Sequence, residues 1–147
     1  MITRILIAGI VTGIVCFFPS ALIYGILSDY VQSNTTQYDG LFRNPPNILG
    51  IIAAGISWGI VTAYILSLKQ KTSMLTDFIT GSIVFTFILI GIELGELATK
   101  NLITVGIAIS GIGTNIIVGG LRGLVAGIVL RRMTKDRGAN TRVSEQS

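Results

Sequence analysis

The run MLTDFITGSIVFTFILIG, residues 74–91, is apolar over a length that suits hydrocarbon better than water. A helix rises about 1.5 Å per residue, so about 20 residues cross the roughly 30 Å apolar layer of a bilayer. The run continues into GIELGELATK, residues 91–100, which carries two carboxylates and a lysine. This stretch therefore predicts a transmembrane helix with an acidic end.

Three further apolar runs have the same character, and the composition agrees with them. Of 147 residues, 50% are hydrophobic and only 12% are charged, which is far too apolar for an ordinary soluble domain. We therefore predict an all-α fold, a polytopic membrane protein with four transmembrane helices in a compact glycine-rich bundle. The transmembrane domain spans residues 1–133, with spans near 5–27, 48–68, 75–97 and 103–130. Residues 134–147 are expected to form a basic, polar and flexible cytoplasmic tail.

The positive charges predict the orientation of these spans. Lysine and arginine are enriched in the short loops on the cytoplasmic side of membrane proteins. If both termini share one side, that side collects eight such residues, and the opposite side holds only Arg43 and Lys100. The eight are Arg4, Lys69, Lys71, Arg131, Arg132, Lys135, Arg137 and Arg142. We therefore expect cytoplasmic termini, and a basic tail that contacts anionic lipids.

Glycines at four-residue spacing occur in every predicted span. Such spacing lets two helix backbones approach closely in a membrane, where hydrophobic attraction between helices is weak. These positions predict the packing faces of the bundle, with the longest stripe on the fourth span. They are Gly9, Gly13, Gly55, Gly59, Gly91, Gly95, Gly119, Gly123 and Gly127.

Asp77 and Arg122 are ionisable residues within the predicted spans, and such residues are candidates for function. Asp77 lies in the first turn of its span, and Ser73 before it is expected to be the N-cap. We expect Asp77 to anchor this end of the helix at the membrane interface. Arg122 lies roughly 12 Å from the cytoplasmic end of its span. Since its long side chain can snorkel toward that end, we expect an ion pair between Arg122 and Asp77.

Glu93 and Glu96 raise the sharper functional question. They share a helix face, and Lys100 follows Glu96 at the favourable four-residue spacing. One interpretation is a polar cluster that ends the helix at the outer rim. The other makes Glu93, which lies deeper, a proton or cation site, with Glu96 beside it. Thr114 and Asn115 are further polar groups that can bond across helices.

Several kinds of chemistry are poorly supported by this composition. The chain has no histidine, and its single cysteine, Cys16, can form neither an internal disulfide nor a thiolate metal cluster. We therefore expect no enzyme activity, no metal and no cofactor. The positive charges follow the pattern of membrane topology, so we expect no nucleic-acid partner.

The order of features resembles uncharacterised small four-helix membrane proteins of bacteria. The resembling segments are LIYGIL (22–27), LFRNPPNILG (41–50), AYIL (63–66) and GGLRGLVAGIVL (119–130). The resemblance implies a location in the bacterial inner membrane. It carries no activity and no site residues.

Two functions remain open from the sequence. The favoured one is a non-enzymatic accessory or scaffold subunit that packs through its glycine faces against a copy of itself or a partner membrane protein. The alternative is a small proton- or cation-coupled transporter or channel that uses Glu93. That alternative requires a homo-oligomer, because four closely packed helices enclose no sizeable pore.

Overall fold

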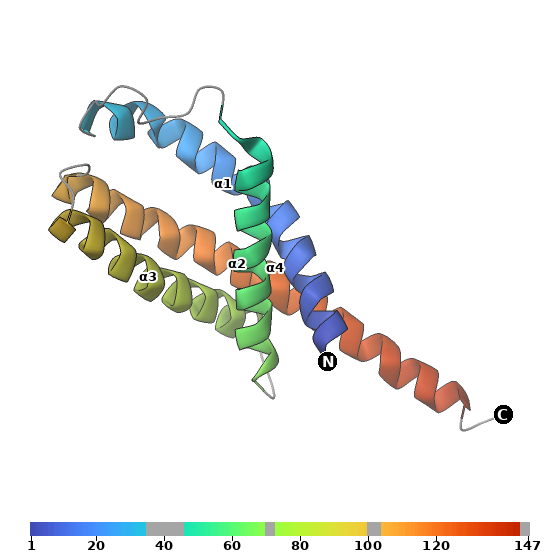
Figure 1. Cartoon of the computed structure of the whole chain (residues 1–147). Helices are drawn as coiled ribbons and strands as arrows, with labels where there is room; N and C mark the ends of the chain where they lie inside the picture. Colours follow the sequence, from blue (N-terminus) through green and yellow to red (C-terminus); the bar gives the residue numbers. More distant parts are fainter. Residues whose placement is uncertain (35–45, 70–72, 100–103, 145–147) are drawn as a thin grey trace.

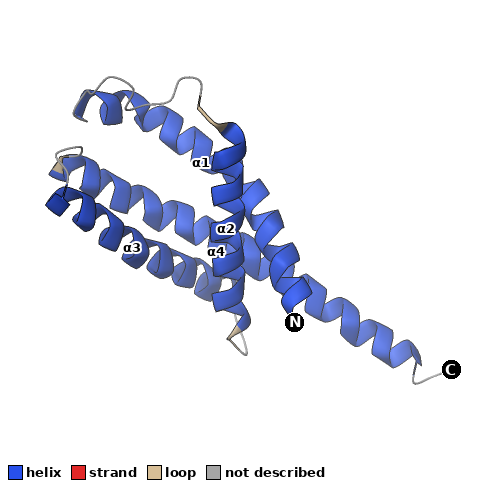
Figure 2. Ribbon diagram, in the orientation of Figure 1, coloured by secondary structure: helices blue, strands red, loops and turns tan. Residues whose placement is uncertain are grey.

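The computed structural model describes residues 1–34, 46–69, 73–99 and 104–144. These residues form four helices, α1 (Ile2–Asn34), α2 (Ile48–Ser67), α3 (Met74–Thr99) and α4 (Val105–Ser144). Figure 2 shows helix throughout the described chain apart from short connections. All four helices contain a stretch long and apolar enough to cross a membrane. The prediction of an all-helical chain with four candidate spans is therefore confirmed.

Two antiparallel pairs organise the helices. α3 and α4 run side by side, and α1 pairs with α2, while α4 also contacts α1 and α2 (Figure 1). The start of α1 and the end of α4 lie toward the same end of the molecule (Figure 1). This arrangement makes α4 the helix that all the others contact.

The first and last helices extend beyond their predicted spans. α1 runs to Asn34 instead of ending near residue 27, and α4 runs to Ser144, where a separate polar tail was expected after residue 133. α1 contains Pro19, and Figure 1 shows this helix changing direction along its length. The hydroxyl of Ser20 donates to the Cys16 carbonyl at 2.7 Å, close to the backbone bond that proline cannot make.

Glycines bring α1 against α2. A Cβ atom on Gly9 would lie 2.6 Å from the Ile60 Cα, and one on Gly13 would lie 2.5 Å from the Ile56 Cα. On the opposite helix, a Cβ on Gly59 would lie 2.9 Å from the Gly13 backbone nitrogen. Real Cβ atoms do not approach backbone so closely, so these positions accept only glycine at this helix separation.

The approach of α3 to α4 is equally close. A Cβ on Gly81 would lie 2.8 Å from the Gly123 Cα, and one on Gly119 would lie 2.7 Å from the Gly81 carbonyl oxygen. The hydroxyl of Ser82 donates to the Ile116 carbonyl of α4 at 2.8 Å. Gly81 was not among the expected packing residues, yet it lies at the centre of this contact.

Gly91 and Gly95 differ from the other expected packing glycines. Nothing lies within 4 Å of a Cβ built on either residue, so neither packs against the described chain. The physical reason is that α3 makes its closest contacts with α4 through its first half, at Gly81 and its neighbours. In the C-terminal half of α3, no described residue therefore packs against these two glycines.

The buried apolar core lies where α1, α2 and α4 meet near the start of the chain. It consists of small and medium side chains, namely Ile5, Ala8, Ala63, Leu66 and Ala126. Nearer the middle of the molecule, Trp58 of α2 packs against Phe85 of α3 with 5.3 Å between ring centroids. These two contacts connect α2 to the helices on either side of it.

We predict that Gly81→Ala destabilises the protein and that Gly91→Ala does not, although both glycines lie on α3. The added methyl group at residue 81 meets α4 backbone, and overpacking of this kind costs about 1–3 kcal/mol. At residue 91 the methyl group meets open space, and alanine favours helix over glycine by about 1 kcal/mol. Thermal unfolding in detergent measures both. Equal melting temperatures for the two variants would contradict the assigned α3–α4 contact.

Candidate functional site

Asp77 lies at the start of α3 and is completely buried. The helix begins there because the Thr76 backbone N–H donates to the Ser73 hydroxyl at 3.1 Å, the N-cap bond expected for Ser73. The carboxylate occupies a notch on α4, where any Cβ on Gly127 would collide with it. Its partner is the Arg131 guanidinium, which donates to the Asp77 Oδ2.

This pairing corrects the predicted ion pair between Asp77 and Arg122. Side chains of a helix lean toward its N-terminus, and α4 runs antiparallel to α3. Arg131 therefore leans back toward Asp77, whereas Arg122 leans away from it. Asp77 lies in the first turn of α3, as expected, and its side chain is fully buried in the notch on α4.

Arg122 lies in the middle of α4, with its guanidinium carbon 4.8 Å from the centroid of the Phe85 ring. This is a cation–π arrangement. Within the described chain no carboxylate lies within ion-pair distance of Arg122, and its buried Nε has no hydrogen-bond partner.

Glu93 lies on the outer half of α3, and its carboxylate contacts α4 at Gly111. A Cβ on Gly111 would collide with the Glu93 Oε1, so glycine makes the room that this carboxylate occupies. The Oε2 atom is buried and finds no hydrogen-bond partner among the described residues. Glu93 is therefore a partly buried acid held against a helix backbone, and it does not simply extend into water.

Glu96 follows one turn later on the same face of α3, near the Glu93 charge. Its expected partner, Lys100, lies outside the described residues. The two glutamates thus remain together at the outer end of α3, as the sequence indicated.

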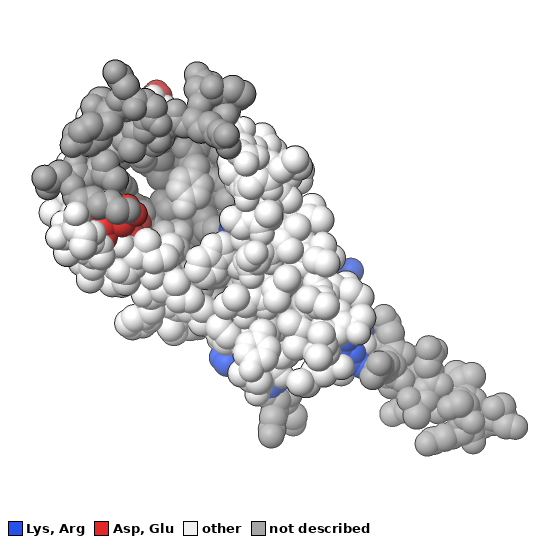
Figure 3. Space-filling view, viewed as in Figure 1, with Lys and Arg blue, Asp and Glu red and all other residues white. Residues whose placement is uncertain are grey.

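The molecule is hollowed at this end. Figure 3 shows a hollow close to the C-terminal end of α3 and the N-terminal end of α4, with acidic atoms on its wall. The described acids of α3 at this end are Glu93 and Glu96.

The other candidate polar residues take simpler roles. Thr114 is buried and donates to the Ser110 carbonyl of its own helix at 2.9 Å, so its hydroxyl does not bond across helices as expected. Asn115 is buried beside it. The bond that crosses from α3 to α4 is made by Ser82 instead.

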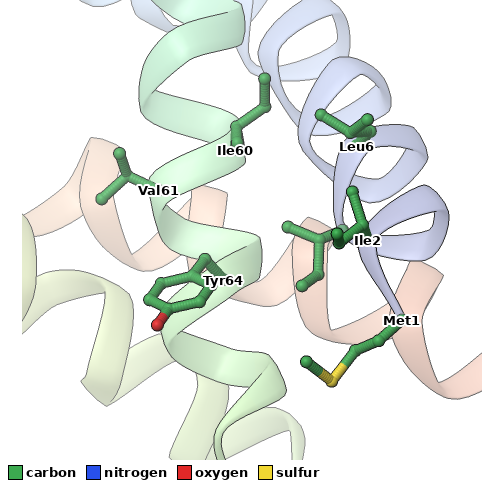
Figure 4. A pocket seen from close by; sticks show the side chains of 7 residues that line it. Met1, Ile2, Leu6, Ile60, Val61 and Tyr64 are labelled. Carbon is green, nitrogen blue, oxygen red and sulfur yellow. The ribbon is translucent and has the colours of Figure 1, made fainter.

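An apolar pocket of about 350 Å³ lies between the start of α1 and α2. Figure 4 shows Ile2 and Leu6 on one side and Ile60, Val61 and Tyr64 on the other. Its lining offers hydrocarbon and one phenol, so it provides no acid–base or metal chemistry. Among the described residues, no group of three or more metal-binding side chains comes together.

Sequence reasoning missed three residues that shape these sites. Gly111 makes room for Glu93, Phe85 supports Arg122, and Arg131 neutralises Asp77. The signal for Arg131 was present in the sequence, because the lean of side chains along an antiparallel helix favours the more C-terminal arginine.

Comparison with known proteins adds no relative, since no family model, curated protein or solved structure matches this chain.

We predict that Arg131→Gln destabilises the protein strongly, because it leaves the buried Asp77 carboxylate without its cation. Breaking a buried pair in this way costs about 3 kcal/mol. The matched control is Arg132→Gln, which removes the same charge from an exposed neighbour and should change stability by less than about 0.5 kcal/mol.

The double variant Asp77→Asn with Arg131→Gln provides the second check on this pair. Removing both charges should restore most of the stability that Arg131→Gln loses, because no charge then remains buried alone. Melting temperatures in detergent measure all of these variants. A double variant no more stable than Arg131→Gln would show that the two side chains do not act together.

Proposed function

We propose that this chain is a small multi-pass membrane protein in which Glu93 forms a proton or cation site used in transport. The observation that carries the proposal is the placement of the Glu93 carboxylate against the α4 backbone at Gly111. One carboxylate oxygen there is buried and has no hydrogen-bond partner among the described residues. A site of this kind gains from a proton or a cation, because either neutralises a charge that burial disfavours.

The position of Glu93 in the chain supports the same proposal. It lies within the apolar stretch of α3, where ionisable residues are costly and mark ion pathways. The hollow of Figure 3 gives the carboxylate a route to water at the outer end. A partly buried acid with access to water from one side suits proton- or cation-coupled transport.

Transport across the whole membrane needs a continuous path, and the close glycine contacts between α3 and α4 leave little room for one within a single chain. We therefore include a homo-oligomer in the proposal, with a glycine-rich bundle as its repeating unit. The exposed apolar side chains of all four helices fit lipid or a second copy. The reaction involves no covalent chemistry, so the proposed role is not enzymatic.

An accessory or scaffold role is the second candidate, and one observation favours it. Gly91 and Gly95 share a face of α3 with open space beside them, and glycines at this spacing suit close contact with another membrane helix. The other glycine pairs already make contacts inside the chain, which leaves this face as the place for a partner.

The proposed location is a bacterial inner membrane with both termini in the cytoplasm. The eight-to-two excess of positive residues supports this orientation, and the two chain ends point toward the same end of the molecule (Figure 1). In this orientation the acidic hollow opens to the outside, and the basic end of α4 meets anionic lipids.

We predict that the purified protein in liposomes carries a proton or monovalent cation flux that depends on Glu93. Under a potassium diffusion potential, Glu93→Gln should reduce this flux by on the order of tenfold or more, because the amide carries no negative charge and cannot be protonated near neutral pH. An internal pH dye measures the flux of protons, and an internal sodium dye measures that of sodium.

The matched control is Glu96→Gln, which makes the same change one turn closer to water and should retain most of the flux. Equal fluxes in Glu93→Gln and the unaltered protein would contradict the role of Glu93. If the unaltered protein carries no flux, the transport proposal fails. Recovery of the native protein in a stable complex with a different membrane protein would then support the accessory role.

We also predict opposite sidedness for reporters fused after Ser147 and inserted in the 35–45 segment. Alkaline phosphatase should be active only in the segment between α1 and α2, and a fluorescent protein only at the C-terminus. Phosphatase activity at the C-terminus would reverse the orientation and place the acidic hollow on the cytoplasmic side.

A further inference from the structure

Arg122 and Arg131 lie on the same helix but in opposite electrostatic situations. Arg131 neutralises a buried aspartate. Arg122 lies within the candidate span of α4 and, in the described chain, has neither a carboxylate within ion-pair distance nor a hydrogen-bond partner for its buried Nε. An arginine at this depth is unfavourable by several kcal/mol unless water or an anion compensates it. Within the part of the chain that the structure describes, no carboxylate neutralises the charge of Arg122.

The Arg122 side chain does not reach the cytoplasmic surface. Snorkelling toward that surface would carry it along Asp77 and Arg131, but its guanidinium instead rests on Phe85, which packs against Gly119. The lean of helical side chains carries it toward the N-terminus of α4, which is the outer end. The charge is therefore directed toward the hollow that Glu93 and Glu96 border.

The contact of Glu93 with Gly111 gives its position along α4 relative to Arg122. Gly111 lies eleven residues before Arg122, which corresponds to about 16 Å between backbone positions along the helix. Because the Arg122 side chain leans toward the N-terminus of α4, it shortens that separation.

We propose that Arg122 binds the oxyanion group of a small solute, a carboxylate or a phosphate, that enters through this hollow. The guanidinium presents a planar fork of donors that matches two oxygens of either group. The ring of Phe85 supports one face of this fork and leaves its edge available. Binding of an anion would neutralise the buried charge that the chain itself leaves uncompensated.

This inference rests on the proposed function and names its substrate class. Two carboxylates at the mouth repel an anion that approaches Arg122, and a proton or cation on Glu93 removes that repulsion. The anion and the proton or cation therefore bind together more favourably than either does alone. The protein would then take up a small anion together with the ion that neutralises Glu93.

Trp58 provides a direct readout, because it is the only tryptophan in the chain and packs on the same Phe85 ring that supports Arg122. The experiment titrates purified protein in detergent with sodium acetate and, separately, with sodium phosphate. Sodium chloride keeps the ionic strength constant. Trp58 fluorescence and the melting temperature are both recorded. We expect a saturable response to at least one of the two anions, and the responding anion identifies the oxyanion group.

Three variants test the role of Arg122. Arg122→Gln should raise the half-saturating concentration by about tenfold or more, since it removes a charge-assisted bidentate contact. Arg122→Lys keeps the charge without the fork and should lie between Arg122→Gln and the unaltered protein. Arg132→Gln is the matched control and should bind the anion as the unaltered protein does. In the absence of added acetate or phosphate, Arg122→Gln should melt at the same or a higher temperature, because it removes an uncompensated buried charge.

A titration that is unresponsive to both anions in the unaltered protein overturns the proposal, and so does a response that persists in Arg122→Gln. If Arg122→Gln melts at a lower temperature and the unaltered protein does not respond to either anion, Arg122 stabilises the fold and does not bind an anion. None of these outcomes tests the role of Glu93 in transport, because the titration measures anion binding at equilibrium and no ion flux. Conversely, a flux that persists in Glu93→Gln contradicts the proposed function and leaves the Arg122 result standing.

Discussion

The close approach of α3 to α4 at Gly81, Gly119 and Gly123 sets the positions of all the charged groups in this protein. Backbone meets backbone there without side chains between, so the register of the two helices cannot shift without a collision. That register brings Asp77 to the notch at Gly127 on one side of the contact. On the other side it brings Glu93 to Gly111. One packing constraint therefore fixes an ion pair at one end and, at the other, a carboxylate whose buried Oε2 has no hydrogen-bond partner among the described residues.

The two arginines of α4 show how helix direction decides which charges meet. Both residues lie within reach of Asp77 by depth alone, but side chains lean toward the helix N-terminus, so only Arg131 turns toward the aspartate. The same lean turns Arg122 outward onto Phe85. Among the described residues, the charge of Arg131 is thus balanced by Asp77, and that of Arg122 has no carboxylate within ion-pair distance. The accessory role assigns no function to the charge of Arg122. The transport role does, because Arg122 would bind the transported anion.

The long first helix creates the space in which these charges face one another. α1 packs tightly on α2 through Gly9 and Gly13, and its far half diverges from α3 (Figure 1). A Cβ on Gly106 would lie 2.9 Å from the Tyr30 hydroxyl, so α1 returns to α4 at its outer end. The hollow of Figure 3 lies at this same end of the molecule. Tight packing at one end and separation at the other follow from where the glycines and the bulky side chains lie along α1.

The amino-acid sequence alone determined the four helices, the approximate bounds of α2 and α3, and the identity of the ionisable residues within the helices. Those features depend on local hydrophobicity and length, which can be read along the chain. The tertiary structure decided which charges pair and which glycines pack. Asp77 pairs with Arg131 instead of Arg122, and Gly81 packs while Gly91 and Gly95 stay open, because these outcomes depend on register and side-chain direction between helices. Glycine spacing indicates where two helices can approach closely, but it does not indicate which helix packs against a given glycine pair. The free carboxylate at Glu93 and the uncompensated Arg122 likewise became visible only once α1, α3 and α4 stood together.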